Sequence, residues 1–261
     1  AVKSLNIKEG SEVITPTFSI ISNTNAIIKN NLKPILIDSD ISTWNINIDD
    51  LEKKINKNTK AIMLPHIYGF SNDMDRILKI CKKNNLFLIE DAAEMIGQNY
   101  KGKPCGSFGD ISIFSFYANK HITTGEGGAI FCNNKAIYER CKNLRNLNFG
   151  KTNRFNHEEL GWNYRFTNMQ AALGLNQLKR IDKIIKKKRE IGNFFYNNLK
   201  KNKNIIIQKP SLDYCKNIYW IFGIIIKDNS KKNTKKIKKE LLKLGIETRD
   251  FFWPMHKQNI Y

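Results

Sequence analysis

The segment from Ile89 to Gly128 holds the residues whose types and spacing could do chemistry. Glu90 and Asp91 close one apolar run, so one of these two carboxylates should project into a ligand crevice. Ser115 stands near the end of a second apolar run, and Lys120 lies four residues beyond that second run. The stretch Gly125 to Gly128 comes next, and glycines allow the backbone to approach a ligand closely. Taken singly, these residues have plainer interpretations: the carboxylate caps the next helix, and the lysine is solvated surface.

Together, an acid, a hydroxyl and an amine match the needs of one cofactor, pyridoxal phosphate. A carboxylate must keep the pyridine nitrogen protonated, so that the ring can withdraw electrons. A lysine must form a Schiff base with the aldehyde, and hydroxyl and backbone donors must hold the phosphate. The sequence therefore predicts a cofactor site, provided that the fold brings these residues to one place.

The elements that would position them alternate along the first 150 residues. Short apolar runs predict strands at Glu12 to Thr15, Pro34 to Ile37, Ala61 to Leu64, Leu86 to Ile89, Ile111 to Phe116 and Ala129 to Cys132. Amphipathic stretches between them predict helices at Thr24 to Asn30, Ile48 to Ile55, Met74 to Asn84 and Lys135 to Leu147. This alternation predicts an α/β fold with a mostly parallel sheet flanked by helices, in which ligands bind beyond the carboxyl ends of the strands.

The second half of the chain predicts a connection and a smaller domain. Apolar residues at helical spacing predict one long helix from Thr167 to Leu199. A strand from Ile218 to Ile226, a basic helix from Thr234 to Leu244 and an extended piece from Gly245 to Asp250 would begin an α+β domain. We expect a large domain at 1–165, a connecting helix at 166–200 and the start of a small domain at 201–261. Because the chain begins at Ala1 without a Met and stops at Tyr261 soon after FFWPMH, we expect both ends to be cut.

Composition sets the remaining bounds. The 261 residues are 41% hydrophobic, which excludes a disordered tail or a disulfide-stapled miniprotein. The net charge of +20 raises the question of nucleic acid, but only eight of 44 basic residues are Arg and the excess Lys is spread along the chain. Five distant cysteines indicate neither a metal cluster nor a disulfide framework, and fit a reducing cytoplasm. We find no apolar run long enough to span a membrane and no signal peptide.

Longer motifs give a resemblance to a known family. The order EDAAE, GSFGD, FSFYANK, TTGEGG, then GWNYRFTNMQAALGLNQL and RDFFWPMH, resembles the DegT-type nucleotide-sugar aminotransferases. These are enzymes of fold type I that use pyridoxal phosphate. The resemblance covers nearly the whole chain, and its motifs are long, ordered and correctly spaced.

The resemblance implies a role for each of five residues. Lys120 would form the Schiff base and shuttle the proton, Asp91 would pair with the pyridine nitrogen, and Glu94 would lie near the ring hydroxyl. Ser115 would bind the phosphate. Asn163, in GWNYR, would reach into the neighbouring subunit's site, which implies a homodimer with shared active sites.

The resemblance also implies a reaction. L-Glutamate would donate its amino group to a nucleotide-linked 4-keto-6-deoxy sugar, most simply a GDP sugar, for surface polysaccharide synthesis. His66 and His256 would line the sugar site, although a structural histidine and a loop histidine are competing interpretations. The alternatives are a UDP- or dTDP-linked keto sugar as substrate, or a non-catalytic protein that binds pyridoxal phosphate or nucleic acid. We expect no metal, no nucleic acid and no membrane as partners.

This sequence departs from the family pattern in three places, and a related branch of the family offers an alternative function. The family's Gly-Thr segment, which helps hold the phosphate, would lie before Ala1, and the C-terminal domain stops partway. Ile20 stands where relatives commonly carry an aromatic residue near the cofactor. A sister branch of 3-dehydratases has a histidine in place of the reactive lysine. Here Lys120 is present and His121 only follows it, which disfavours a dehydratase.

Overall fold

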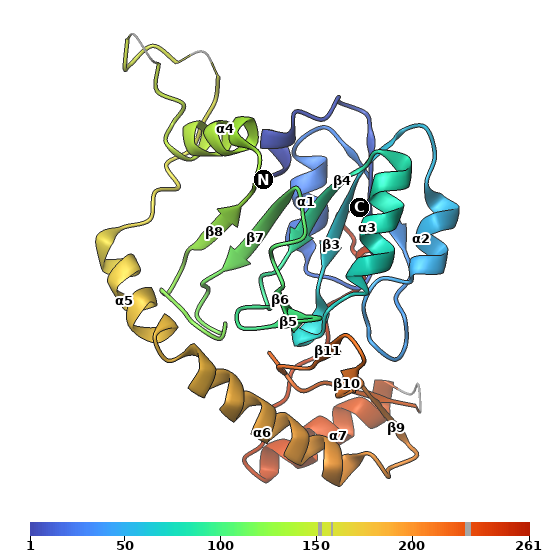
Figure 1. Cartoon of the computed structure of the whole chain (residues 1–261). Helices are drawn as coiled ribbons and strands as arrows, with labels where there is room; N and C mark the ends of the chain where they lie inside the picture. The colour runs from blue at the N-terminus through green and yellow to red at the C-terminus, as the bar shows by residue number, and fades with distance from the viewer. Residues whose placement is uncertain (151–152, 158, 228–230) are drawn as a thin grey trace.

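The structure is a computed structural model that describes residues 1–150, 153–157, 159–227 and 231–261. A six-stranded sheet in the order β2-β1-β3-β4-β7-β8 forms its centre (Figure 1). The strands are β1 (Glu12–Pro16), β2 (Lys33–Ile37), β3 (Thr59–Pro65), β4 (Phe87–Asp91), β7 (Ile111–Ser115) and β8 (Gly128–Phe131). All neighbouring pairs are parallel except β7 and β8, which are antiparallel. The predicted mostly parallel sheet is confirmed.

Four helices cover the two faces of this sheet. They are α1 (Ile21–Ile28), α2 (Ile48–Lys54), α3 (Met74–Asn84) and α4 (Lys135–Arg145). Side chains of Asn47, Asp73 and Asn134 accept hydrogen bonds from the first backbone N–H groups of α2, α3 and α4, which explains where these helices begin. Helix α1 begins three residues earlier than predicted and has no such cap.

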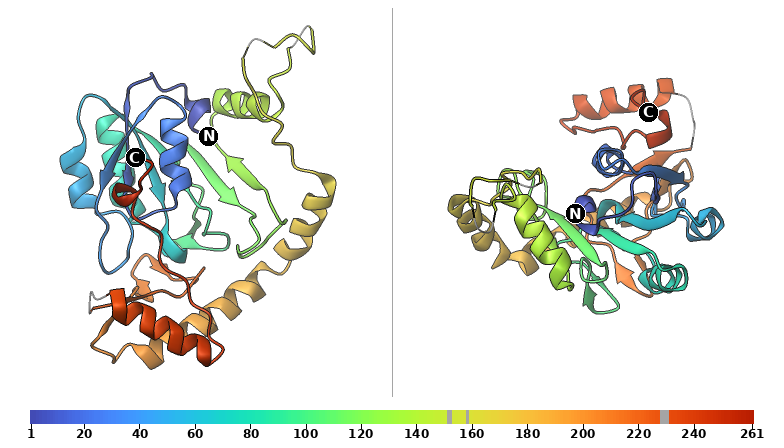
Figure 2. Two further views of the ribbon diagram at one scale, coloured as in Figure 1. Left: turned by 180° about the vertical axis from the view of Figure 1, so that it is seen from behind. Right: turned by 90° about the horizontal axis from the view of Figure 1, so that it is seen from above.

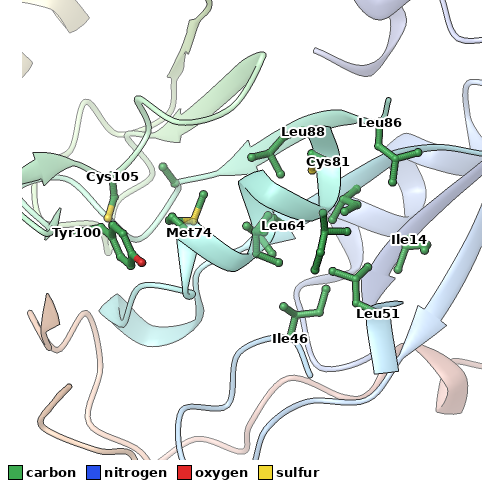
Figure 3. Packing of buried hydrophobic residues seen from close by; sticks show 14 of the residues in the cluster. Ile14, Ile46, Leu51, Leu64, Met74, Cys81, Leu86, Leu88, Tyr100 and Cys105 are labelled. Carbon is green, nitrogen blue, oxygen red and sulfur yellow. The ribbon is translucent and has the colours of Figure 1, made fainter. Parts of the chain in front are cut away.

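The sheet has a core on each face because successive side chains of a strand point to opposite sides. On one face Ile14, Leu64 and Leu88 pack against Leu51 of α2 and Met74 of α3, as Figure 3 shows. The opposite face holds the neighbouring strand residues, among them Val13, Met63 and Ile89, with α1 and α4 over them. The central strands are thus covered on both faces, whereas the edge strand β8 is largely exposed.

The single long helix predicted at 167–199 is wrong, because the chain forms two helices there. These are α5 (Asn168–Leu178) and α6 (Ile181–Leu199), and Arg180 between them has non-helical angles. The cause is that they pack on different parts of the molecule. Gln177 of α5 exchanges two hydrogen bonds with the backbone of Thr123, whereas Ile185 of α6 packs closely over Gly97.

The end of the chain returns to the large sheet, and the small elements that precede it lie beside α6 (Figure 2). They are β9 (Ile205–Ile207) paired with β12 (Ile224–Ile226), β10 (Ser211–Leu212) paired with β11 (Cys215–Lys216), and α7 (Lys231–Lys243). The predicted strand at 218–226 is therefore correct only for its last three residues, and residues 246–250 form no regular element.

Short elements complete the chain. A β-ribbon joins β5 (Asn99–Tyr100) and β6 (Lys103–Pro104), and three single turns of 3-10 helix lie at Val2–Leu5, Ile67–Gly69 and Met255–Lys257. Among the helices of the described ranges, we find none that has both the length and the apolar character needed to cross a membrane.

Candidate active site

A cavity of about 350 Å³ lies beyond the carboxyl ends of β3, β4 and β7. Its size falls in the range of sites for small molecules and cofactors. Most of its lining follows a strand end, as expected for an open α/β sheet. The lining residues are Ser19, Ile20, Ser22, Asn23, Pro65, His66, Ile67, Asp91, Ala93, Glu94, Ile113, Phe114, Ser115, Tyr117, Asn119, Lys120, Trp220 and Phe252.

Asp91 is the last residue of β4 and is only 5% exposed. One carboxylate oxygen accepts a hydrogen bond from the Asn23 side chain (2.9 Å), and the other accepts from the backbone N–H of Ala93 (3.0 Å). Asn23 also donates to the Ser19 hydroxyl (3.1 Å). The carboxylate is thus held at a fixed position in the cavity wall by α1.

Lys120 lies in the loop after β7, and its side chain is 11% exposed. Its Nζ is 3.8 Å from Oε1 of Glu94 and 3.9 Å from the centre of the Trp220 ring. Burial lowers the pKa of Lys120, and the negative charges of Glu94 and Asp91 oppose that shift only in part. The amine is therefore closer to its neutral, nucleophilic form than a surface lysine is.

Glu94 faces Lys120 from the turn after β4. Its Oε2 accepts a short hydrogen bond from the backbone N–H of Tyr68 (2.6 Å). Burial raises the pKa of Glu94, although the attraction of Lys120 and the hydrogen bond from Tyr68 act in the opposite direction. Burial thus shifts both members of the pair toward their neutral forms, and their charged atoms lie 3.8 Å apart, a distance for an ion pair rather than a hydrogen bond.

Ser115 ends β7 and lies in the cavity lining, where its hydroxyl accepts a hydrogen bond from the backbone N–H of Tyr117 (3.2 Å). That hydroxyl can still donate its own proton to a ligand oxygen. The structure therefore brings together Asp91, Glu94, Ser115 and Lys120, four of the five residues predicted to hold the cofactor.

Asn163 is the fifth, and it lies away from the cavity within this chain. It is exposed and forms an isolated β-bridge with Asn146. Beside it the rings of Trp162 and Tyr164 stack with their centres 5.9 Å apart, and Tyr164 is 70% exposed. Its contact with a neighbouring subunit's site stays a prediction.

His66 borders the cavity, but its ring is fully engaged in the protein interior. Nδ1 lies 3.1 Å from the backbone N–H of Asn72 and must accept from it, so Nε2 carries the proton and donates to Oε1 of Glu90 (3.0 Å). Glu90 also accepts from three backbone N–H groups of the 106–109 turn and from the Ser112 hydroxyl. Burial alone would raise the pKa of Glu90, but these hydrogen bonds hold it below its usual value.

His256 is exposed and lies outside the cavity lining. Its Nδ1 is 2.6 Å from the hydroxyl of Thr17, which follows β1. This contact ties the end of the chain to the same edge of the sheet as the cavity. The ring keeps its second nitrogen available.

Two further positions bear on the predicted departures. Ile20 does line the cavity, and it is 42% exposed. His121 is buried beside the cavity, and burial together with the positive charge of Lys188 lowers its pKa to about 4, so it is neutral. It does not replace Lys120.

Ser19, Ser22 and three further residues of the site were not predicted from the sequence. Asn23 follows β1 and contacts Asp91, so the rule that strand ends bear ligand sites could have found it. Tyr68 contributes only a backbone N–H, which no residue type reveals. Trp220 comes from a segment far along the chain, and nothing local to it indicates a contact with Lys120.

The donor set of the cavity fits pyridoxal phosphate. Asp91 is a buried, fixed carboxylate for the ring nitrogen, Lys120 is an amine with a lowered pKa for the aldehyde, and Ser19, Ser22 and Ser115 offer hydroxyls for the phosphate. The cavity walls are otherwise largely apolar, as a planar ring requires.

Comparisons with known proteins agree with this geometry. The model of the DegT/DnrJ/EryC1/StrS aminotransferase family matches residues 1–261. A GDP-perosamine synthase of Escherichia coli O157:H7 is 43% identical over 263 residues, which is 100% of this chain and 70% of that protein.

Two solved structures are also similar to this chain. One is a Helicobacter pylori aminotransferase involved in the biosynthesis of pseudoaminic acid, with a TM-score of 0.90 and 30% identity. The match covers 97% of this chain and 68% of the H. pylori chain. The other is an E. coli GDP-4-keto-6-deoxy-D-mannose-3-dehydratase with bound hydrated pyridoxal phosphate, with a TM-score of 0.88 and 27% identity. The match covers 97% of this chain and 69% of the dehydratase chain. The fold and the cofactor predicted from the motifs are confirmed.

Proposed function

This chain belongs to the DegT/DnrJ/EryC1/StrS aminotransferase family, and on that basis we propose that it makes GDP-perosamine for surface polysaccharide. L-Glutamate donates an amino group to C4 of a GDP-linked 4-keto-6-deoxy hexose. The observation that carries this proposal is that Lys120, Glu94 and Asp91 line the same cavity. The similarity to a GDP-perosamine synthase supports the choice of sugar.

Pyridoxal phosphate, when bound, supplies an aldehyde that condenses with amines and a ring that withdraws electrons from the substrate carbon. Lys120 provides the amine that holds it and moves a proton at its own Nζ. Asp91, fixed by Asn23, keeps a negative charge beside the ring nitrogen. Ser115 donates its hydroxyl proton to the phosphate. Glu94 holds or releases a proton 3.8 Å from Lys120 and so adjusts the charge of the amine.

The two histidines have different parts in this proposal. His256 has an exposed ring and a nitrogen that makes no contact with Thr17, so it is suited to contact the nucleotide sugar. His66 uses both ring nitrogens inside the protein, so it supports the wall of the cavity through Glu90 and Asn72 rather than by contact with the sugar. The same cavity serves glutamate and sugar in turn, so initial rates should give parallel double-reciprocal lines.

We also propose that two copies of the chain form a homodimer and that the enzyme acts in the cytoplasm. The exposed aromatic residues around Asn163 support an interface there. The five cysteines are all unpaired, and three of them are buried, which suits a reducing compartment.

The test is to incubate the protein with pyridoxal phosphate, L-glutamate and a panel of GDP-, UDP- and dTDP-linked keto sugars, and to identify the aminated product by mass. We expect amination of the GDP-linked 4-keto-6-deoxy sugar and none with the Lys120→Ala variant. A preference for a UDP or dTDP sugar would reject the proposed substrate and keep the family. No amination of any sugar by protein that holds the cofactor would reject the activity.

A further inference from the structure

We propose that Trp220 is a positioning residue that holds the side-chain amine of Lys120 against Glu94 and favours its protonated form. This inference rests on the proposed role of Lys120 as the amine that takes the cofactor. Trp220 comes from the segment before β12, about 100 residues along the chain from Lys120. Its indole is nevertheless buried in the wall of the same cavity.

The indole is fixed relative to the lysine that it contacts. The Lys120 ammonium lies 3.9 Å from the centre of the ring, which is the geometry of a cation–π contact. The indole Nε1–H donates to the backbone carbonyl of Asn119, the residue next to Lys120 (2.9 Å). The ring is therefore bound both to the backbone that carries Lys120 and, by its face, to the amine.

The backbone of Trp220 is held from two further directions. Its N–H donates to the carbonyl of Tyr68 (3.2 Å), and its own carbonyl accepts from Nζ of Lys188 on α6 (2.7 Å). Two residues earlier, the N–H of Ile218 donates to the carbonyl of Gly69 (3.2 Å). These bonds explain why this segment is irregular although its residues are buried: it packs against residues 68–69 instead of joining a sheet.

Tyr68 connects the two groups that flank the amine. Its N–H binds Glu94, its carbonyl binds the N–H of Trp220, and its ring lies 5.9 Å from the Trp220 ring. Tyr68 has a φ of 59°, a left-handed conformation that is uncommon for a residue with a side chain and that requires support from its surroundings. Tyr68, in its strained conformation, therefore helps to hold both groups that contact Lys120: the Glu94 carboxylate on one side and the Trp220 ring on the other.

The arrangement has a consequence for the charge of Lys120. Glu94 and Asp91 face the amine from the cavity wall, His121 follows it in the chain, and Lys188 lies behind the carbonyl of Trp220. Burial opposes the charged form, whereas the two carboxylates and the aromatic face favour it. Loss of the aromatic face while Lys120 stays buried should therefore lower the pKa of Lys120, and leave the amine without a surface that directs it toward Glu94.

The experiment measures the pKa of Lys120 directly in the cofactor-free protein. The rate of labelling of Lys120 by acetic anhydride is followed against pH by peptide mass spectrometry, with exposed lysines of the same molecule as internal references. The variants are Trp220→Leu, which has no aromatic face, and Trp220→Phe, which keeps a smaller aromatic face and has a side chain closer in volume to Leu than to Trp. Trp253→Leu is the control, because Trp253 donates its indole N–H to Lys257 and does not line the cavity.

We expect the labelling midpoint of Lys120 to fall by about one pH unit in Trp220→Leu, by less in Trp220→Phe, and not at all in Trp253→Leu. An unchanged or higher midpoint in a folded Trp220→Leu protein would overturn the inference. If that variant does not fold, an unchanged midpoint in Trp220→Phe would overturn it equally. The role of Lys120 itself is tested separately, because attachment of the cofactor to another lysine rejects the proposed function without changing these midpoints.

Discussion

The position of Asp91 shows how one side chain in the site depends on the residues around it. A buried carboxylate is costly unless it is hydrogen-bonded, and Asp91 receives one bond from Asn23 and one from Ala93. Neither partner carries a positive charge. The carboxylate therefore keeps its negative charge available for a cationic ligand group, such as the protonated nitrogen of a pyridine ring.

Replacing that charge should affect the reaction more than the fold. We expect Asp91→Asn to slow transamination on the order of 100-fold or more, because a hydrogen bond to a charged group contributes about 1.5–3 kcal/mol and the ring also loses its electron-withdrawing character. Glu94→Gln should have a smaller effect, since it touches the amine and not the ring nitrogen. Turnover measured with saturating cofactor checks both, and Asp75→Asn, which removes an exposed ion pair with Lys101, is the matched control. Near wild-type turnover of Asp91→Asn would contradict this role.

Site residues could be predicted from the sequence where they belong to a motif of chemically reactive side chains. The spacing of Ser115, Lys120 and the Glu90–Asp91 pair after apolar runs was enough to predict one shared site, because parallel strands end at the same edge. The family resemblance was needed to choose Asp91 over Glu90. Prediction was weak where a contact depends on packing. Trp220 reaches Lys120 only because its backbone is bound to Tyr68 and Lys188, and no local pattern reports those bonds.

At the scale of elements, the contact between residues 68–69 and 218–220 connects the large sheet to the last third of the chain. Gly69 has a φ of +91°, and a Cβ added there would lie 2.9 Å from Cγ1 of Ile218 and 2.9 Å from the backbone nitrogen of Trp220. Both the conformation and the space exclude a side chain at this position. The close approach of the two segments, and with it the place of Trp220, depends on this glycine.

We therefore expect Gly69→Ala to lower the free energy of unfolding by about 2–4 kcal/mol, because left-handed strain of about 1–2 kcal/mol adds to the cost of overlap. Gly102→Ala measures the backbone strain alone, since Gly102 has a φ of +83° and no atom lies within 4 Å of an added Cβ. Urea unfolding of both variants gives the comparison. Equal losses in the two variants would mean that the overlap at Gly69 relaxes freely and that this contact does not fix Trp220.

Element boundaries followed the sequence where a cap fixes them. Helix α3 has the predicted bounds, because the Asp73 side chain accepts from the N–H of Arg76 at its start, and Asn85 ends it in a left-handed conformation. The bend between α5 and α6 could not be predicted, because the apolar spacing continues through Arg180. What separates the two helices is their contacts, with the Thr123 loop in one case and with Gly97 in the other.

At the scale of the whole molecule, apolar side chains remain exposed in the loop after α4 and along α5. The most exposed of them are Phe155 (78%), Leu160 (81%), Tyr164 (70%), Met169 (83%) and Leu175 (60%). An exposed apolar surface of this kind marks an interaction site. In the homodimer proposed above, the second copy of the chain covers these residues, and Asn163 contributes to the site of the partner subunit.

Subunit mixing tests this arrangement. Lys120→Ala and an Asn163→Ala variant shown to be strongly impaired are combined under conditions of subunit exchange. A heterodimer would hold one intact site and one with both defects, so an equal mixture should recover about a quarter of wild-type activity. If exchange is confirmed and activity does not return, Asn163 acts in its own subunit's site or has no part in the reaction.

The central claim is that Lys120 is the amine that binds pyridoxal phosphate, and trapping that bond tests it most directly. The protein is incubated with the cofactor, reduced with borohydride, digested and mapped by mass spectrometry, with a folded Lys120→Ala variant as the control. We predict one labelled peptide, carrying the cofactor on Lys120, and neither label nor transamination in the variant. A label on another lysine, such as Lys101 or Lys103, or full activity of Lys120→Ala, would contradict the account.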